Sequence, residues 1–188
     1  GDWKLPVYIY ATTLTVSLFG LSELAVRLPS ALFGTATVAL TFFLALELLQ
    51  SRRLALLTML FTAIAPWHIH LSRVESESNI AVFFVTLAML LFLKSLKSRS
   101  WVVILGLILF ALTYFTYAGN FIFTTLLLLG ALFIYKSDIP KTKTFFAAGA
   151  IFILLLGFIS FQTMFGNQTK FSGIGIFGDP SVVHAKLE

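Results

Sequence analysis

The sequence predicts an all-α fold: a polytopic helical membrane protein with about six transmembrane helices and one interfacial juxtamembrane helix. Hydrophobic residues make up 59% of the 188 residues and charged residues 11%, whereas soluble domains carry about 25% charged residues. A chain of this length cannot hide so much apolar surface from water. The composition therefore excludes a soluble globular enzyme, a disordered chain and a nucleic-acid-binding module.

The apolar runs define the expected elements. Residues 6–20 are too few to cross about 30 Å of hydrocarbon, so we expect an interfacial helix there. Pro29 suits the first turn of the first span, and Gly119-Asn120 divides one long apolar block into a helical hairpin. Longer runs predict spans at approximately 29–49, 54–71, 79–96, 101–118, 119–135 and 145–163. The chain thus divides into part of a first outer loop (1–28), a transmembrane bundle (29–163) and the start of an outer loop or extracytoplasmic domain (164–188).

Charge placement predicts the orientation in the membrane. With residues 6–20 in the interface, successive loops fall on alternate sides, and one side holds eight of the 13 basic residues with two acidic residues. The other side holds five basic and six acidic residues. The excess of Lys and Arg places the first side in the cytoplasm. Orientation therefore explains the net charge of +5, and no nucleic-acid partner is needed.

Two basic residues on the predicted outer side are candidate binding groups, because ionisable residues near a membrane are costly. Lys4 can pair with a lipid-linked phosphate as a point charge, or it can extend to the headgroups as an ordinary interfacial lysine. Arg27 can bind a phosphate or carboxylate through two donors. Its alternative is an ion pair with Glu23 one helical turn away.

A second outer stretch brings Arg73, Glu75 and Glu77 within five residues of one another. A carboxylate there can orient a hydroxyl group, act as a base or hold a divalent cation. The alternative is a solvated loop before the next helix, and the spacing does not choose between the two glutamates. Tyr117 and Asn120 lie at the predicted outer hairpin, where they can line a sugar pocket or belong to an interfacial aromatic belt.

The motif His68-x-His70 invites a metal interpretation. On a helix, residues two apart point in different directions. Beside Trp67 at the end of a span, the pair is more typical of an interfacial belt. The chain has no cysteine, so thiolate ligands are excluded and any metal site remains undetermined.

Three stretches carry a family resemblance: D-W-K-L-P-V-Y-I-Y at 2–10, F-G-L-S-E at 19–23 and V-R-L-P-S-A-L-F-G at 26–34. They resemble the polyprenyl-phosphate-sugar-dependent glycosyltransferases of the GT-C superfamily. The most similar branch contains bacterial protein O-mannosyltransferases, lipid A aminoarabinose transferases and rhizobial lipopolysaccharide sugar transferases. The resemblance covers about residues 1–135, and R-L-P-S-A-L-x-G is its more specific part.

The resemblance implies an enzyme that moves a sugar from a polyprenyl-phosphate donor to a lipid, glycan or protein acceptor. The reaction is expected on the extracytoplasmic face of the plasma membrane, by an inverting displacement. Lys4 of the K-x-P motif is then expected near the donor phosphate, with Arg27 of the R-L-P motif supporting the site. The acidic position after the S-R pair maps most simply to Glu77, with Glu75 second. A divalent metal ion could share the task of offsetting charge on the leaving group in some relatives, so this cofactor is left open.

One departure from the family pattern concerns the catalytic base. The family uses an aspartate upstream of the K-x-P lysine, in a stretch that would precede Gly1, and Asp2 does not match that position. We therefore expect an internal fragment without a catalytic residue of its own, inactive in isolation. The alternatives are a transporter or flippase for a lipid-linked or small solute, and a non-catalytic membrane subunit. Spans nearly free of charge and the lack of an internal repeat favour the enzyme.

Overall fold

The computed structural model describes residues 6–98, 102–117 and 119–139, together with positions 147, 149–150, 152–154 and 157. The described part is helical throughout and contains no strand, which confirms the predicted all-α class. Lys4, most of the span expected at 145–163 and the segment 164–188 lie outside the described residues. The helices are α1 (Pro6–Phe19), α2 (Glu23–Leu49), α3 (Arg52–Ile64), α4 (Pro66–Arg73), α5 (Glu77–Ser98), α6 (Val102–Tyr114) and α7 (Asn120–Ile134).

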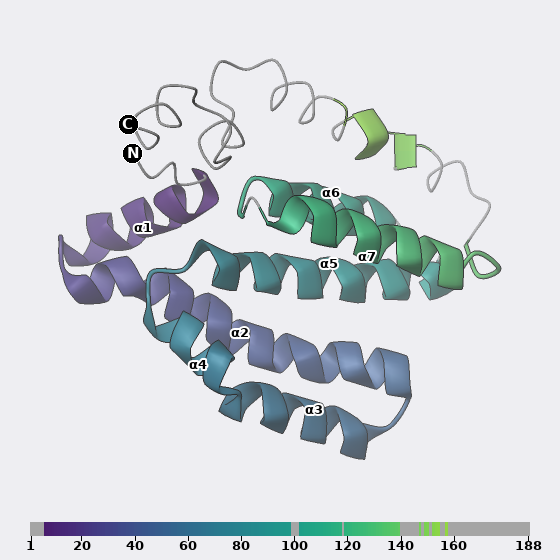
Figure 1. The fold of residues 1–188 in the computed structure, drawn as a ribbon, viewed down its shortest axis with the longest axis horizontal. Coiled ribbons are helices and arrows are strands. Elements are labelled where there is room, and N and C mark those ends of the chain that lie inside the picture. Colours follow the sequence, from purple (N-terminus) through teal and green to yellow (C-terminus); the bar gives the residue numbers. More distant parts are fainter. Residues whose placement is uncertain are drawn as a thin grey trace, which may run out of the picture.

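The long helix α2 is the centre of the arrangement (Figure 1). Helices α3 and α4 cover one side of α2, α5 covers another, and α6 and α7 lie on the far side of α5. Helix α1 contacts the N-terminal part of α2. The main apolar core joins α5 to α6 and α7, and it is built around the buried side chains of Phe92, Leu107 and Phe110.

Two described helices, α2 and α5, are long and apolar enough to cross a membrane, and α3 with α4 makes a third if the bent pair is one span. Helices α6 and α7 have 13 and 15 residues, or about 20 Å and about 22 Å. Both are shorter than the roughly 30 Å of a hydrocarbon core. The described residues therefore give two or three candidate spans, and the expected number of about six is not reached.

Two expected helix boundaries differ in the structure, both at prolines. The span expected over 54–71 is divided at Ala65-Pro66 into α3 and α4, which meet at an angle of 55°. Pro66 cannot donate a helical hydrogen bond and excludes its predecessor from helical geometry, which ends α3. Conversely, Pro29 does not start a helix, because α2 already begins at Glu23 with Ser22 as its N-cap.

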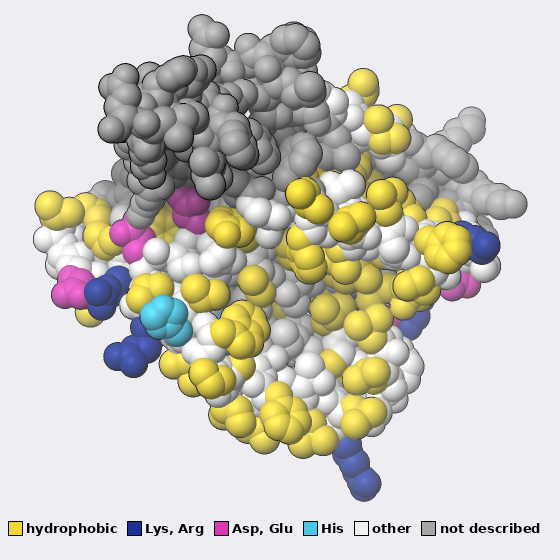
Figure 2. Space-filling model, in the orientation of Figure 1, with side chains coloured by type: hydrophobic (Ala, Val, Ile, Leu, Met, Phe, Trp, Pro, Cys, Tyr) yellow, Lys and Arg dark blue, Asp and Glu magenta, His cyan; other side chains and the backbone are white. Residues whose placement is uncertain are grey.

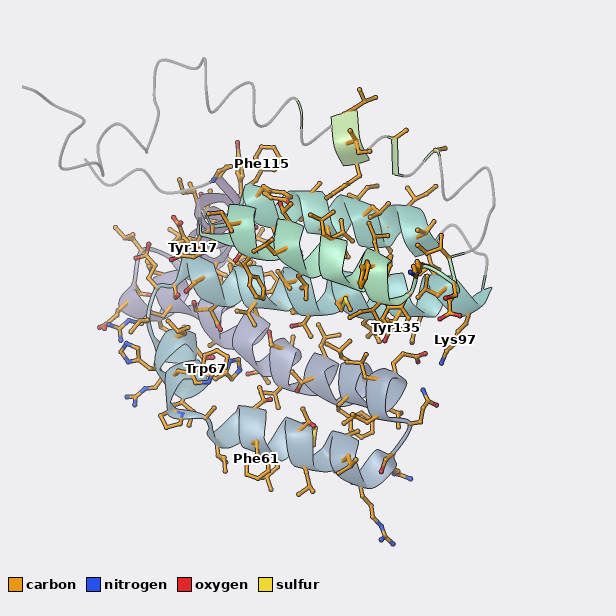
Figure 3. All side chains as sticks on the ribbon, turned by 45° about the vertical axis from the view of Figure 1, so that its right-hand side comes forward. Phe61, Trp67, Lys97, Phe115, Tyr117 and Tyr135 are labelled. Carbon is orange, nitrogen blue, oxygen red and sulfur yellow. The ribbon has the colours of Figure 1, made fainter. Side chains whose placement is uncertain are left out.

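Many hydrophobic side chains are exposed on the face of the molecule that Figure 2 shows. Large hydrophobic side chains are exposed on α3 and α7, among them Phe61 at 64% and Phe133 at 73%. Exposed aromatic residues Trp67 and Tyr117 lie toward one end of the bundle, and Tyr135 lies toward the other (Figure 3). Apolar sides between aromatic ends are typical of helices in a bilayer, where Trp and Tyr prefer the interfaces.

Candidate functional site

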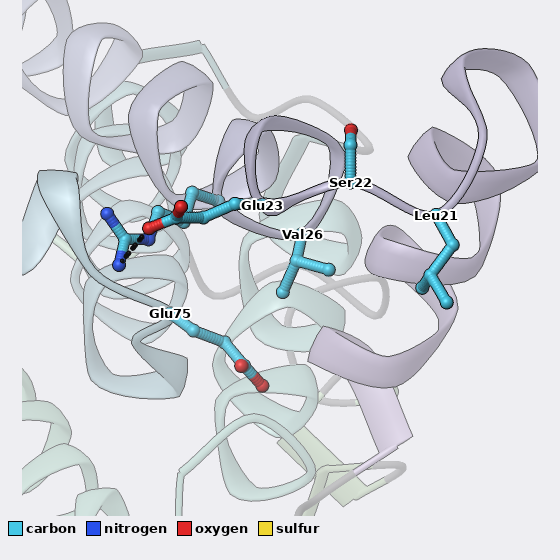
Figure 4. Close-up of a pocket in the computed structure, with 6 residues that line it drawn as sticks. Leu21, Ser22, Glu23, Val26 and Glu75 are labelled. Atoms are coloured by element: carbon cyan, nitrogen blue, oxygen red, sulfur yellow. Dashed lines mark ion pairs between the residues drawn. The ribbon is translucent and has the colours of Figure 1, made fainter.

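The N-terminal end of α2 and the loop between α4 and α5 line an open hollow of about 420 Å³. Glu23, Val26 and Arg27 contribute from α2, and Glu75 contributes from the loop (Figure 4). Leu21 and Ser22, just before α2, complete the wall. Two residues that the sequence singled out separately, Arg27 and Glu75, thus line one concave site.

Arg27 forms an ion pair with Glu23, and both residues line this hollow. The guanidinium Nη2 lies 2.7 Å from the carboxylate Oε1, and the two side chains are 52% and 75% exposed. The structure thus contains the ion pair between Arg27 and Glu23, which was the alternative role predicted for Arg27 from the sequence. An exposed pair of this kind contributes roughly 0.2–1 kcal/mol. An anion that binds the guanidinium through two hydrogen bonds can displace Glu23 at that small cost.

Helix α1 holds the first turns of α2 through two buried hydroxyl groups. Pro29 has no N–H to bond the carbonyl of Ala25, four residues earlier. The Thr15 hydroxyl donates to that carbonyl at 2.6 Å, and the Tyr8 hydroxyl donates to the Val26 carbonyl at 3.0 Å. Both donors are buried. Helix α1 thus supplies hydrogen bonds where the proline interrupts the helix.

A buried polar junction joins α2 to α4 and α5 on another side. We define this junction by residues Ser30, Gly34, His68, Ser72, Ser76 and Asn79. His68 Nε2 lies 3.1 Å from the Gly34 carbonyl, so that nitrogen donates the hydrogen bond. Asn79 Nδ2 donates to the Ser30 carbonyl at 2.7 Å and lies 3.5 Å from Ser72 Oγ. The junction fixes the α4–α5 loop, which carries Glu75, against α2.

The remaining predicted residues lie near the same end of the bundle but outside the hollow. Arg73 is exposed at the end of α4, and Glu77 is in the first turn of α5. Tyr117 follows α6 and is 42% exposed, while Asn120 begins α7 with its Nδ2 atom buried and unpartnered among the described residues. The structure therefore brings Glu75, rather than Glu77, together with Arg27.

The His68-x-His70 pair does not form a metal site in the described structure. On α4, His68 is buried and His70 is exposed, as residues two apart on a helix require. No group of three or more His, Cys, Asp or Glu residues that could hold a metal ion occurs among the described residues. His68 instead belongs to the polar junction.

Charged residues separate to the two ends of the bundle. The end with the hollow carries two arginines and three glutamates: Arg27, Arg73, Glu23, Glu75 and Glu77. The ends of α2, α5 and α7 and the start of α3 form the opposite end (Figure 1). There the basic side chains exceed the acidic ones: Arg52, Arg53, Lys94, Lys97 and Lys136 against Glu47 and Asp138. An excess of basic residues at only one end of the bundle agrees with the positive-inside rule for membrane proteins.

Sequence reasoning missed the junction residues Ser30, Gly34 and Asn79. A signal was present, since Ser30 and Gly34 are small residues four apart and therefore share one face of α2. Such a face permits close approach of a neighbouring helix. The identity of that neighbour was not encoded in the local pattern.

A family profile described as dolichyl-phosphate-mannose-protein mannosyltransferase matches residues 4–156. The chain belongs to this family. No curated protein and no solved structure matches the chain. Membership of the mannosyltransferase family makes this a membrane glycosyltransferase of mannosyltransferase type, in agreement with the apolar helices. The matched region includes the whole of the hollow and the polar junction.

Proposed function

We propose that this protein transfers a sugar, mannose in the first instance, from a polyprenyl-phosphate donor to an acceptor on the extracytoplasmic side of the plasma membrane. The observation that carries the proposal is the match to the mannosyltransferase family. The matched residues include a hollow that is lined by both arginine and glutamate side chains. The donor class and the protein acceptors named for the family are extended to this chain as part of the proposal. A lipid or glycan acceptor would use the same chemistry.

Arg27 is proposed to bind the donor phosphate. Its guanidinium is half-exposed at the edge of the hollow, and its partner Glu23 is still more exposed. A lipid-linked phosphate could approach from the adjoining apolar surface, where Leu21 and Leu24 are 88% and 66% exposed. As the sugar leaves, negative charge develops on the phosphate, and a fixed guanidinium stabilises it. Lys4, the lysine of the K-x-P motif that precedes Arg27 in the chain, would add a second cation.

Glu75 is proposed to contact the sugar or the acceptor hydroxyl. It lies in the same hollow as Arg27 but comes from a separate element, so it can face a different part of the ligand. We assign to Glu75 the orientation of hydroxyl groups rather than the role of general base. Arg73, Glu77, Tyr117 and Asn120 remain predicted contacts of the acceptor or sugar.

The location of charge supports a reaction at one membrane surface. Within the described residues the charged side chains lie toward helix ends, whereas transporters place polar sites near the midplane. This observation favours the transferase over a transporter or flippase. The less basic end carries the hollow, so we assign that end to the extracytoplasmic side. We also propose about six spans for the complete bundle, because the apolar runs of the sequence are long enough for that number.

The test measures sugar transfer in proteoliposomes by the protein extended through its expected upstream segment. A panel of radiolabelled polyprenyl-phosphate sugars serves as donors. Arg27→Ala removes a charged hydrogen-bonding group worth about 1.5–3 kcal/mol, so the donor KM should rise about 10- to 100-fold. The matched control is Arg53→Ala, an exposed arginine in the first turn of α3 at the opposite end.

Three results would decide the proposal. A rise in donor KM for Arg27→Ala, with Arg53→Ala near the unsubstituted value, supports the phosphate-binding role. An equal effect of both substitutions refutes a specific site at Arg27. If no donor is used and the liposomes instead move a lipid or solute across the bilayer, the transferase proposal fails and the transporter takes its place.

A further inference from the structure

Ser30 connects α2 to the loop that carries Glu75. Its side chain is fully buried, and its Oγ atom makes two hydrogen bonds with the backbone of Ser76. The Ser76 N–H donates to Ser30 Oγ at 3.2 Å, and the Ser30 hydroxyl donates to the Ser76 carbonyl at 3.3 Å. The two residues are 46 positions apart in the chain. One hydroxyl group therefore holds both polar groups of the residue that follows Glu75.

The backbone of Ser30 makes a third connection. Asn79 Nδ2 donates to the Ser30 carbonyl at 2.7 Å, and Asn79 is fully buried in the first turn of α5. Ser30 thus joins α2 both to the loop and to the helix that the loop enters. Unpaired polar groups at such a buried site are costly, so these partners favour a single position of the loop.

This anchor lies next to both sides of the hollow. Arg27 is three residues before Ser30 on α2, and Glu75 is directly before Ser76. Both Arg27 and Glu75 line the hollow, whereas Ser30 and Ser76 are buried and are not among its lining residues. We infer that Ser30 is a positioning residue, which sets the place of the Glu75 carboxylate relative to the Arg27 guanidinium. The expected effect of Ser30 on catalysis rests on the proposed transferase function, whereas its effect on the position of the loop does not.

The position of the loop can be measured without any activity. The chain contains no cysteine, so Leu21→Cys and Glu75→Cys introduce a unique pair of sites for spin labels on the walls of the hollow. In lipid nanodiscs, continuous-wave EPR should show strong dipolar broadening between the labels. Adding Ser30→Ala should weaken and spread this coupling, because the loop loses both bonds to Oγ.

Ser76→Ala is the matched control for Ser30→Ala. It makes the same chemical change in the same junction, but Ser76 bonds to Ser30 through its backbone. The substitution removes only the Ser76 Oγ to Ser78 Oγ hydrogen bond of 2.7 Å. The dipolar coupling should therefore stay as in the parent pair. Equal coupling in Ser30→Ala and Ser76→Ala would overturn the inference.

A double-mutant cycle tests the catalytic consequence in the extended, active protein. A displaced catalytic geometry can cost up to about 100-fold in rate, so Ser30→Ala should lower kcat about 10- to 100-fold. The donor KM should change less, because Arg27 keeps its own place on α2. In a Glu75→Gln background, Ser30→Ala should lower kcat less than about twofold, as coupled residues are not additive. The same loss in both backgrounds refutes action through Glu75.

Hydrogen exchange keeps the inference testable if Ser30→Ala does not fold. In the unsubstituted chain the Ser76 amide donates to a buried hydroxyl and should exchange slowly, unlike an exposed loop amide. Rapid exchange at that amide would overturn the inference. If the protein transfers no sugar, the proposed function fails, while the EPR and exchange results still decide whether Ser30 holds the loop.

Discussion

Gly34→Ala should destabilise the protein, because α4 and α5 pack directly against the missing side chain of this residue. A Cβ atom at position 34 would lie 2.1 Å from Ser72 Oγ, 2.9 Å from Ser72 Cβ and 2.9 Å from Asn79 Nδ2. Rotation of the serine hydroxyl relieves the first contact only. The other two require α4 or the Asn79 side chain to shift, and Asn79 is fully buried and bonded to Ser30.

The magnitude follows from comparison with a second helical glycine. Overpacking a close contact costs about 1–3 kcal/mol, while Ala gains about 1 kcal/mol over Gly in helix propensity. Gly130 lies within α7, is exposed and has no atom within 4 Å of an added Cβ. Gly130→Ala shares the gain without the clash. The difference in unfolding free energy between the two variants should therefore be about 1–3 kcal/mol.

Thermal unfolding in detergent, followed by tryptophan fluorescence, measures this difference. Trp67 reports on α4, since it is in that helix and its ring lies 5.3 Å from that of His68. At roughly 2–4 °C per kcal/mol for a chain of this size, Gly34→Ala should melt several degrees below Gly130→Ala. A Gly34→Ala variant that melts at or above the control would refute the tight contact between α2 and α4.

Two further predictions concern the attachment of α1 and the ion pair at the hollow. Tyr8→Phe and Thr15→Val each remove a hydrogen bond to α2 and should cost about 1 kcal/mol. Thr13→Val removes only a bond within α1 and serves as the control; equal melting temperatures in all three would contradict the role of α1. Glu23→Gln frees Arg27 and should lower the donor KM about two- to fivefold, an effect that high salt reduces. A raised KM would show that Glu23 itself assists binding.

Hydropathy predicted the all-α class of the described residues, but the consequences of Pro29 could not be predicted locally. A proline normally marks a helix start, and the sequence placed the helix boundary there. In the structure, α2 begins at Glu23 and continues through Pro29. The Thr15 hydroxyl that compensates for the lost helical hydrogen bond comes from another helix. Periodicity along one segment carries no information about such a donor.

Pro66 is the opposite case. The proline itself indicated a helix boundary, but the hydropathy of the surrounding run favoured one continuous span. The apolar run over 54–71 favoured one span, yet the proline divides it and turns α4 by 55°. The turn brings His68 and Ser72 onto α2 at Gly34. The bend therefore has a structural use: it forms the polar junction.

The candidate site was only partly predictable for a similar reason. The spacing of Glu23 and Arg27 sufficed to predict their ion pair as one of two roles, because residues four apart on a helix are neighbours. Choosing between Glu75 and Glu77 required the path of the α4–α5 loop. That path depends on contacts to Ser30 across 46 residues, and long-range pairing of this kind is set by packing rather than by local sequence.

Three residues of the R-L-P-S-A-L-F-G segment share one face of α2, and the elements that cover this face differ along its length. Arg27, Ser30 and Gly34 are spaced by three and four residues and so share a face of α2. Gly34 is covered by α4, and Ser30 is covered by the loop and the start of α5. Arg27 is one turn further toward the end of α2, where this cover stops and the hollow opens. The residues that bury the face therefore also determine where its charged group emerges. Because Ser30 holds the loop that carries Glu75, a change at Ser30 should alter the position of Glu75, while Arg27 keeps its place on α2.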